Sequence, residues 1–204
     1  IGNKAYLGLG HINGTGVETL FSDWWEFDPA SNSWAQKASY PANNGLGDMD
    51  VMALEINSKG IVGGGFHDSA YYEYSPVTNT WNYLGDIPAY FGFVNHIAIN
   101  ETGYFCDWPS QNMYEYDSNL NTWTQDLSFA VPVGSLFYYF FSNGTKMYFV
   151  HYSGQTLIPW SYDVSNGVWT ELAPMPSEYN FGFPVEHLGK TYLLGVYENS
   201  IFEY

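Results

Sequence analysis

Three of the five histidines, His11, His67 and His151, lie at or just after the end of predicted strands in three different copies of a repeat. Because imidazole nitrogen is a common metal ligand, three such side chains converging from separate segments would form a metal site. No HxH or HExxH spacing accompanies them, and equivalent positions of a repeat also hold similar residues for packing. We therefore predict no metal ion and no other cofactor, and we keep His11 and His67 as ligand-binding candidates.

Nucleophilic catalysis has no support in the sequence. There is no GxSxG segment, and the single cysteine, Cys106, lacks a local Cys-His signature. We interpret Cys106 as a small apolar side chain that fills core space at a strand end. The segment Asp48-Met49-Asp50 suggests a Ca²⁺ site, although it lacks EF-hand spacing. We predict no catalytic residue.

The other candidates are side chains of predicted loops that contain no lysine. Phosphate, sulfate and acidic peptides call for Arg or Lys, so these ligands are disfavoured. Carboxylates, tyrosine, asparagine and histidine instead suit a neutral sugar, a cationic group or a protein surface. Besides the two histidines, the candidate ligand-binding residues are Asp68, Tyr90, Trp108, Tyr152, Tyr179 and Tyr197.

The charge balance excludes two classes of partner. Five lysines and no arginine stand against 21 acidic residues, which gives a net charge of −16. Nucleic acid and anionic membrane surfaces are held mainly by basic side chains, so neither is expected as a partner. Four of the lysines occupy equivalent positions between the first two strands of a repeat, at the face opposite the candidate loops: Lys4, Lys59, Lys146 and Lys190. The fifth, Lys37, falls in a predicted fourth strand, where charge discourages edge pairing.

The composition predicts a folded chain of many short strands. Hydrophobic residues make up 46% of the 204 residues and aromatic residues 20%, with 21 Gly and 10 Pro as turn formers. A single cysteine permits no internal disulfide. No apolar run approaches the roughly 20 residues needed to span a bilayer, so membrane insertion is not expected. We predict one domain, residues 1–204.

An internal repeat organises this domain. Four tryptophans are spaced 47, 42 and 46 residues apart, and each follows an aromatic residue by seven positions and a turn sequence by one or two: Phe27/Trp34, Tyr74/Trp81, Tyr116/Trp123 and Tyr162/Trp169. Alternation such as Trp25-Glu26-Phe27 marks a strand before the turn. Upstream of it lies an apolar hairpin, so each repeat has four antiparallel strands, as in the blade of a β-propeller.

The predicted first strands are 51–56, 94–99, 136–141 and 183–188, and the predicted second strands are 4–10, 59–65, 103–108, 146–152 and 190–196. The order from residue 1 is three strands, three sets of four and three more strands. This arrangement amounts to about four and a half repeats. It favours a segment of a longer propeller, with a small five-bladed ring as the alternative.

The chain resembles kelch-repeat propeller proteins. The resemblance covers essentially the whole chain and is carried by Gly63-Gly64 at the end of a second strand, the strand-three aromatic, the turn and the tryptophan. The glycine pair has a weakened form in Gly8-Leu9-Gly10 and is replaced in the other three copies, and the arginine common after the fourth strand is absent. In similar proteins the loops after strands two and four bind ligands. A copper oxidase resembling galactose oxidase and sugar-acid epimerases also share this fold, but no motif here matches the copper site.

These observations predict an all-β, kelch-type propeller that serves as a non-catalytic binding module for a protein or a neutral glycan. The resemblance implies a secreted bacterial protein, extracellular or at the cell surface, with further blades or domains of the same polypeptide as partners. Two alternatives stay open: a kelch-like carbohydrate-active enzyme of the oxidase or epimerase type, and an architectural subunit of a larger surface assembly.

Overall fold

The structure is a computed structural model, and it describes residues 1–12, 19–88, 95–107, 110–130, 137–153, 156–174, 181–187, 190–195 and 201–203. The chain divides into two compact units. Unit 1 comprises Ile1–Val94 and Tyr116–Thr124, and unit 2 comprises Asn95–Glu115 and Gln125–Tyr204. Within the described residues, no helix has both the length and the hydropathy needed to cross a membrane.

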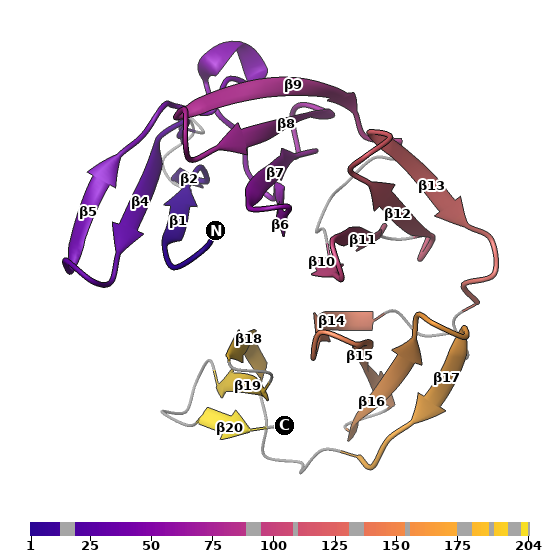
Figure 1. Cartoon of the computed structure of the whole chain (residues 1–204). Helices are drawn as coiled ribbons and strands as arrows, with labels where there is room; N and C mark the ends of the chain where they lie inside the picture. Colours follow the sequence, from indigo (N-terminus) through magenta and orange to yellow (C-terminus); the bar gives the residue numbers. More distant parts are fainter. Residues whose placement is uncertain are drawn as a thin grey trace. The chain divides into compact units, whose positions relative to one another are not determined.

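The first half of the chain folds into antiparallel sheets whose strands follow one another in sequence (Figure 1). A three-stranded sheet consists of β1 (Ala5–Gly8), β4 (Trp24–Asp28) and β5 (Ser33–Gln36). A four-stranded sheet follows, with β6 (Met52–Ile56), β7 (Lys59–Gly63), β8 (Ala70–Ser75) and β9 (Thr80–Asp86). The 3₁₀ turn η1 (Asn43–Gly45) lies between β5 and β6.

The second half repeats the four-stranded pattern. One sheet has the order β10 (Asn95–Ile99), β11 (Thr102–Cys106), β12 (Met113–Asp117) and β13 (Thr122–Asp126). The next contains β14 (Phe137–Ser142), β15 (Lys146–Ser153), β16 (Thr156–Asp163) and β17 (Val168–Glu171). A final sheet has three strands, β18 (Phe181–His187), β19 (Lys190–Gly195) and β20 (Ile201–Glu203).

These sheets confirm the predicted strand order within the described residues. The predicted first strands coincide with β6, β10, β14 and β18 to within two residues at either end. One element was missed: no strand was predicted between the second strand 4–10 and the strand that contains Trp25, but a two-stranded ribbon of β2 (His11–Ile12) and β3 (Thr19–Leu20) lies there. Strands of two residues are too short to show an alternating pattern, so periodicity does not reveal them.

The seven-residue spacing between aromatic and tryptophan has a direct structural cause. Phe27 lies opposite Trp34 in the β4–β5 register, and Tyr74 and Tyr162 lie opposite Trp81 and Trp169 in the same way. The ring centroids of the four pairs, including Tyr116 and Trp123, are 4.7 to 4.9 Å apart. Each pair is therefore a cross-strand aromatic contact that fixes the register of its hairpin.

The turn between these partners explains why asparagine recurs two residues before the tryptophan. Asn32, Asn79 and Asn121 have φ values of 50°, 54° and 51°, and Gly167 holds the fourth position at 71°. Asparagine and glycine are the residues that adopt this left-handed conformation most readily. The turn chemistry thus sets the length of the connection.

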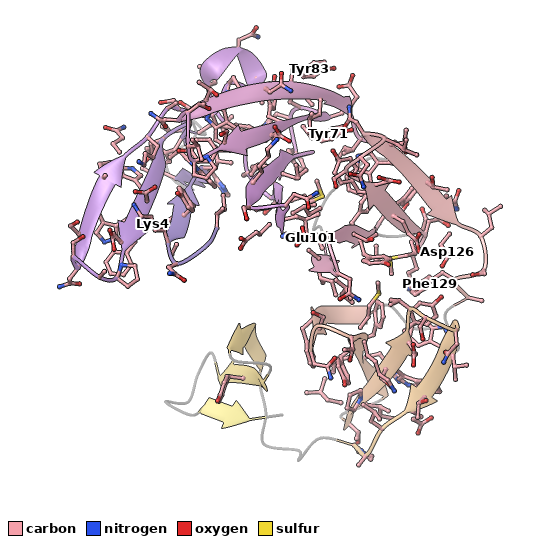
Figure 2. All side chains as sticks on the ribbon, in the orientation of Figure 1. Lys4, Tyr71, Tyr83, Glu101, Asp126 and Phe129 are labelled. Atoms are coloured by element: carbon pink, nitrogen blue, oxygen red, sulfur yellow. The ribbon has the colours of Figure 1, made fainter. Side chains whose placement is uncertain are left out.

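Each unit has its own hydrophobic core. In unit 1 the buried residues Trp24, Tyr40, Ala42, Val62 and Tyr74 form one cluster. In unit 2 the cluster consists of Ile97, Ile99, Tyr104, Cys106, Met113, Phe129, Met147, Phe149 and Tyr162. Tyr40 and Phe129 both stand thirteen residues after a strand-three aromatic. The ring centroid of Tyr40 lies 5.2 Å from that of Trp81 in the next sheet, and the ring centroid of Phe129 lies 5.1 Å from that of Trp169 in the next sheet. Phe129 is labelled in Figure 2.

Candidate functional site

A buried carboxylate organises the loops of unit 1. Asp48 lies in the connection between β5 and β6, and its side chain is only 1% exposed. Its oxygens accept hydrogen bonds from the backbone N–H groups of Met49 at 2.8 Å, His67 at 3.1 Å and Asp68 at 3.0 Å. The Nδ1 atom of His67 lies 3.0 Å from the same carboxylate. Such multiple donation offsets the cost of burying the charge and ties the β5–β6 and β7–β8 connections together.

Asp68 provides a second link between these two connections. One carboxylate oxygen accepts the N–H of Asn43 at 2.8 Å, and the other accepts the N–H of Ala70 at 2.9 Å. The amide of Asn43 in turn donates to the carbonyl of Gly47. The start of η1 is therefore held against the residues that lead into β8.

Further backbone contacts connect the ribbon of β2 and β3 to the same place. The N–H of Gly10 donates to the carbonyl of Asp48, and the N–H of Phe21 donates to the carbonyl of Gly10, both at 2.9 Å. Gly47 has a φ of 91°, and a Cβ atom there would lie 1.8 Å from the carbonyl oxygen of Phe21. Glycine is required at this position for the close approach of the two segments. We call the assembly of residues 9–12, 20–23, 42–50 and 64–70 the loop cluster.

The loop cluster presents apolar side chains beside a fixed histidine. Leu46 is 63% exposed and Phe66 44%, and Ile12 and Phe21 are also exposed. The ring of Phe66 lies edge-on to that of His67, with centroids 5.2 Å apart. The carboxylate of Asp48 lies against the Nδ1 side of the ring, so the imidazole of His67 is held in one orientation. The cluster thus combines apolar contact area with an oriented hydrogen-bonding group.

Of the residues predicted as ligand-binding, His67 and Asp68 belong to the loop cluster, and both are braced by Asp48. His11 lies in β2 opposite Leu20, one residue after Gly10. Tyr152 is a residue of β15 opposite Leu157. The other four predicted residues lie outside the described part of the chain: Tyr90, Trp108, Tyr179 and Tyr197.

The histidines considered as metal ligands divide between the units, because His11 and His67 belong to unit 1 and His151 to unit 2. His151 is buried in β15, opposite Ile158. Among the described residues, no group of three or more His, Cys, Asp or Glu side chains could hold a metal ion. The suggestion of a Ca²⁺ site at Asp48-Met49-Asp50 is not supported either, because backbone donors occupy both carboxylate oxygens of Asp48.

Sequence reasoning did not identify the bracing role of buried aspartate. Asp107 plays a similar part in unit 2, where it is buried and accepts the N–H of Asn112 at 2.7 Å. The backbone N–H of Asp107 donates to the carbonyl of Asn112, which closes the loop after β11. A signal was present in both cases: each carboxylate lies close in sequence to a short loop between predicted strands, where local capping of backbone N–H groups is common.

Cys106 has the environment expected of a packing residue. It lies in the core of unit 2, and burial raises the pKa of its thiol to about 12, with a further contribution from the charge of Asp107. A thiol in this state supplies almost no thiolate at neutral pH, so it is a poor nucleophile.

The three lysines of unit 1, Lys4, Lys37 and Lys59, form ion pairs with carboxylates of the strands. The ammonium of Lys4 lies 2.7 Å from Glu26, and that of Lys59 lies 2.8 Å from Glu73. Lys37, predicted to lie in a fourth strand, directly follows the end of β5 and places its ammonium 3.3 Å from Glu26. The hydrogen bond from Lys4, reinforced by those from Tyr6 and Lys37, lowers the pKa of Glu26 to about 2. Figure 2 labels Lys4 beside β1.

Comparison with known proteins gives a likeness of fold. No family model matches the sequence, and no curated protein matches it. Solved structures do match, among them the structure of YjhT, with a TM-score of 0.67 and 15% sequence identity. That alignment covers 94% of this chain and 68% of the YjhT chain. The fold is β-rich and propeller-like. At 15% identity the similarity indicates a shared fold and not a shared function, because proteins of one fold have many different functions.

Proposed function

We propose that this protein is a non-catalytic recognition module with kelch-type blades, which binds a protein segment or a neutral glycan through the loop cluster. The observation that carries the proposal is the exposed pair of Phe66 and His67 on loops held rigid by the buried carboxylate of Asp48. Exposed apolar side chains on a braced surface are typical of binding sites. Preorganisation of this kind lowers the entropy cost of binding.

The charges favour an uncharged ligand. The loop cluster contains no lysine, and three of the five lysines, Lys4, Lys37 and Lys59, are engaged by Glu26 and Glu73. An anionic ligand would meet Asp48 and Asp68 with no cation to compensate. A neutral ligand can stack on the exposed ring of Phe66 and contact the exposed side chain of Leu46.

The kelch assignment is supported by the glycine pair at the end of β7. A Cβ atom at Gly63, whose φ is 153°, would lie 2.4 Å from the carbonyl oxygen of Ala70. Gly64 has a φ of 67°, and its N–H donates to the same carbonyl. The pair is thus required by the close approach of β8, as its place in the kelch pattern implies. With the acidity of the chain, this resemblance also leads us to propose an extracellular or cell-surface location.

The proposal is tested by screening the purified chain against immobilised neutral oligosaccharides (glucans, mannans, xylans and chitin fragments) and against a displayed peptide library. Ligands that bind are then measured by calorimetry with Phe66→Ala, His67→Ala and the control Val77→Ala, which removes a side chain that is 93% exposed in another turn. We expect Phe66→Ala to weaken binding at least tenfold and Val77→Ala to leave it unchanged. Binding that Phe66→Ala does not alter, or an absence of binding in both screens, would overturn the proposal.

A further inference from the structure

The outer strand of the second sheet carries an exposed tyrosine that the repeat does not require. Tyr83 lies in β9, the last strand in the order β6-β7-β8-β9, and it is 55% exposed. Figure 2 labels it on this strand. It stands two residues after the repeated tryptophan, a position that the other three repeats fill with polar side chains: Gln36, Gln125 and Glu171. An aromatic ring at this position is therefore specific to one sheet.

A β-bulge and two neighbouring side chains orient the ring of Tyr83. The β8–β9 register shifts between Tyr71 and Tyr72, which places Tyr83 next to the bulge. Bulges of this kind re-aim side chains and occur often beside functional sites. The ring of Tyr83 makes an edge contact with that of Tyr72, with centroids 5.5 Å apart, and its hydroxyl donates to Asp86 at 3.0 Å. The ring is thus held in place although Tyr83 remains largely accessible.

Asp86 provides a fixed carboxylate beside this ring. One of its oxygens accepts the hydroxyl of Tyr83, and the other accepts the hydroxyl of Ser69 at 2.9 Å. Asp86 is itself exposed, so the remaining lone pairs of both oxygens are accessible to a further donor. The hydrogen bond to Asp86, burial and the charges of Asp86 and Asp68 raise the pKa of Tyr83. Burial and the same two carboxylates raise the pKa of Tyr72, so the surface around both rings is electronegative.

The cations of unit 1 are engaged by other carboxylates. Lys4 and Lys37 pair with Glu26, and Lys59 pairs with Glu73. Among the residues that the structure describes, none forms an ion pair with Asp86. The face of an aromatic ring is also negative, so the ring and the carboxylate attract the same kind of group. Both therefore favour a cation.

We propose that Tyr72, Tyr83 and Asp86, which we call the tyrosine patch, bind an arginine side chain of a partner protein. The guanidinium stacks on the ring of Tyr83 and donates to Asp86. Arginine fits better than lysine, because the guanidinium is planar, stacks on aromatic rings and is more weakly hydrated than an ammonium. The net charge of −16 attracts basic partners to the chain, and the patch supplies a specific contact. The patch borders the loop cluster at Ser69 but does not include the exposed apolar side chains of that cluster.

The test is a titration of the folded chain, at low salt, with the blocked peptide acetyl-Gly-Arg-Gly-amide. The matched probe has citrulline in place of arginine, which keeps the planar head group and removes its charge. Binding is followed by the NMR shifts of the backbone amides of Tyr72, Tyr83 and Asp86. We expect saturable shifts with the arginine peptide and an affinity weaker by about tenfold with the citrulline peptide.

Variants locate the binding on the patch. Tyr83→Gln introduces the residue that the repeat already uses at the equivalent position in β5 and β13, so it suits an outer strand. Tyr83→Gln and Asp86→Asn should each weaken binding of the arginine peptide by about fivefold. Glu171→Gln removes an exposed charge at the equivalent position in β17 and should bind as the wild type does. Phe66→Ala should also bind normally, because it alters only the loop cluster.

Three outcomes would contradict the proposal. The first is equal affinity for the arginine and citrulline peptides, and the second is an absence of saturable shifts in the wild type. The third is an equal loss of affinity in Asp86→Asn and Glu171→Gln, which would show attraction by net charge alone. If Tyr83→Gln fails to fold by circular dichroism, Tyr83→Leu replaces it. Since Phe66→Ala leaves the patch intact, this site and the proposed recognition site can fail separately.

Discussion

The indole N–H of Trp81 donates a 2.8 Å hydrogen bond to the carbonyl of Ala38, which lies 43 residues earlier in the preceding sheet. The same indole packs against Tyr74 in its own hairpin, with ring centroids 4.8 Å apart. Trp81 therefore makes two separate contacts. Its ring fixes the register of its own hairpin, and its N–H connects that hairpin to the preceding sheet. A substitution that removes the N–H and keeps an aromatic ring measures the contribution of the hydrogen bond to stability.

Trp81→Phe keeps an aromatic ring on Tyr74 and removes the N–H that binds Ala38. We expect a loss of about 1–2 kcal/mol in the free energy of unfolding, because one hydrogen bond disappears and a half-buried carbonyl loses its donor. Trp34→Phe is the matched control, since Trp34 occupies the same repeat position and its indole N–H forms no hydrogen bond with the described residues. Trp34→Phe should change stability by less than about 0.5 kcal/mol. Urea unfolding monitored by circular dichroism measures both, and equal losses would contradict the role given to the Trp81 N–H.

Glu26 predicts how stability depends on acid. Its hydrogen bonds from Lys4, Tyr6 and Lys37 lower the folded-state pKa to about 2 from an ordinary value of 4.5. A carboxyl group with a depressed pKa stabilises the fold above its unfolded-state pKa, and this contribution is lost as the pH falls from about 4.5 towards 2. Wild type should therefore lose about 2 kcal/mol more than Glu26→Gln over this interval. Urea unfolding at several pH values measures the difference, and parallel pH profiles would contradict the prediction.

The strand pattern could be predicted from the sequence because its determinants are local. The spacing of Tyr74 and Trp81 is set by one turn, and the positive φ of Asn79 follows from the residue type. The apolar first and second strands were equally visible, since buried strands form continuous hydrophobic runs. Register and sheet order therefore followed from patterns within about 15 residues of each other.

The loop cluster could be predicted only in part because its contacts are not local. His67 and Asp68 were candidates on the basis of residue type, but the carboxylate that holds them comes from Asp48, some 20 residues away. The place of Asp48 beside a short loop is a signal for capping of backbone N–H groups, but it does not indicate that two of these groups belong to His67 and Asp68. The pairing of Lys37 with Glu26 was missed for the same reason, because it depends on the side chain of Lys37 crossing from β5 to β4.

The reactivity of the Cys106 thiol tests whether this side chain is a buried packing residue or an accessible nucleophile. Burial raises the pKa of its thiol to about 12, so very little thiolate forms at pH 8. We expect Cys106 to react with a disulfide reagent such as DTNB far more slowly in the folded chain than in urea-unfolded chain at the same pH. The colour change of the reagent measures both rates. Similar rates in the two states would show that the thiol is accessible, and its assignment to the core would then be wrong.

Asp48→Asn tests whether the buried carboxylate holds the loop cluster. An asparagine has one acceptor oxygen in place of two, and its NH₂ group would face the backbone N–H groups of Met49, His67 and Asp68. We expect a loss of about 2–4 kcal/mol in the free energy of unfolding, because hydrogen bonds to a buried charge are lost and donors are left unpaired. Amide exchange at His67 and Asp68 should also accelerate.

The control is Asp50→Asn, which changes an exposed neighbour with a φ of 54° that asparagine tolerates equally well. Because the proposed recognition site depends on this brace, Asp48→Asn should weaken ligand binding even below its unfolding transition, whereas Asp50→Asn should not. If both variants exchange and unfold alike, the loops are held by their other contacts, and Asp48 does not organise the site.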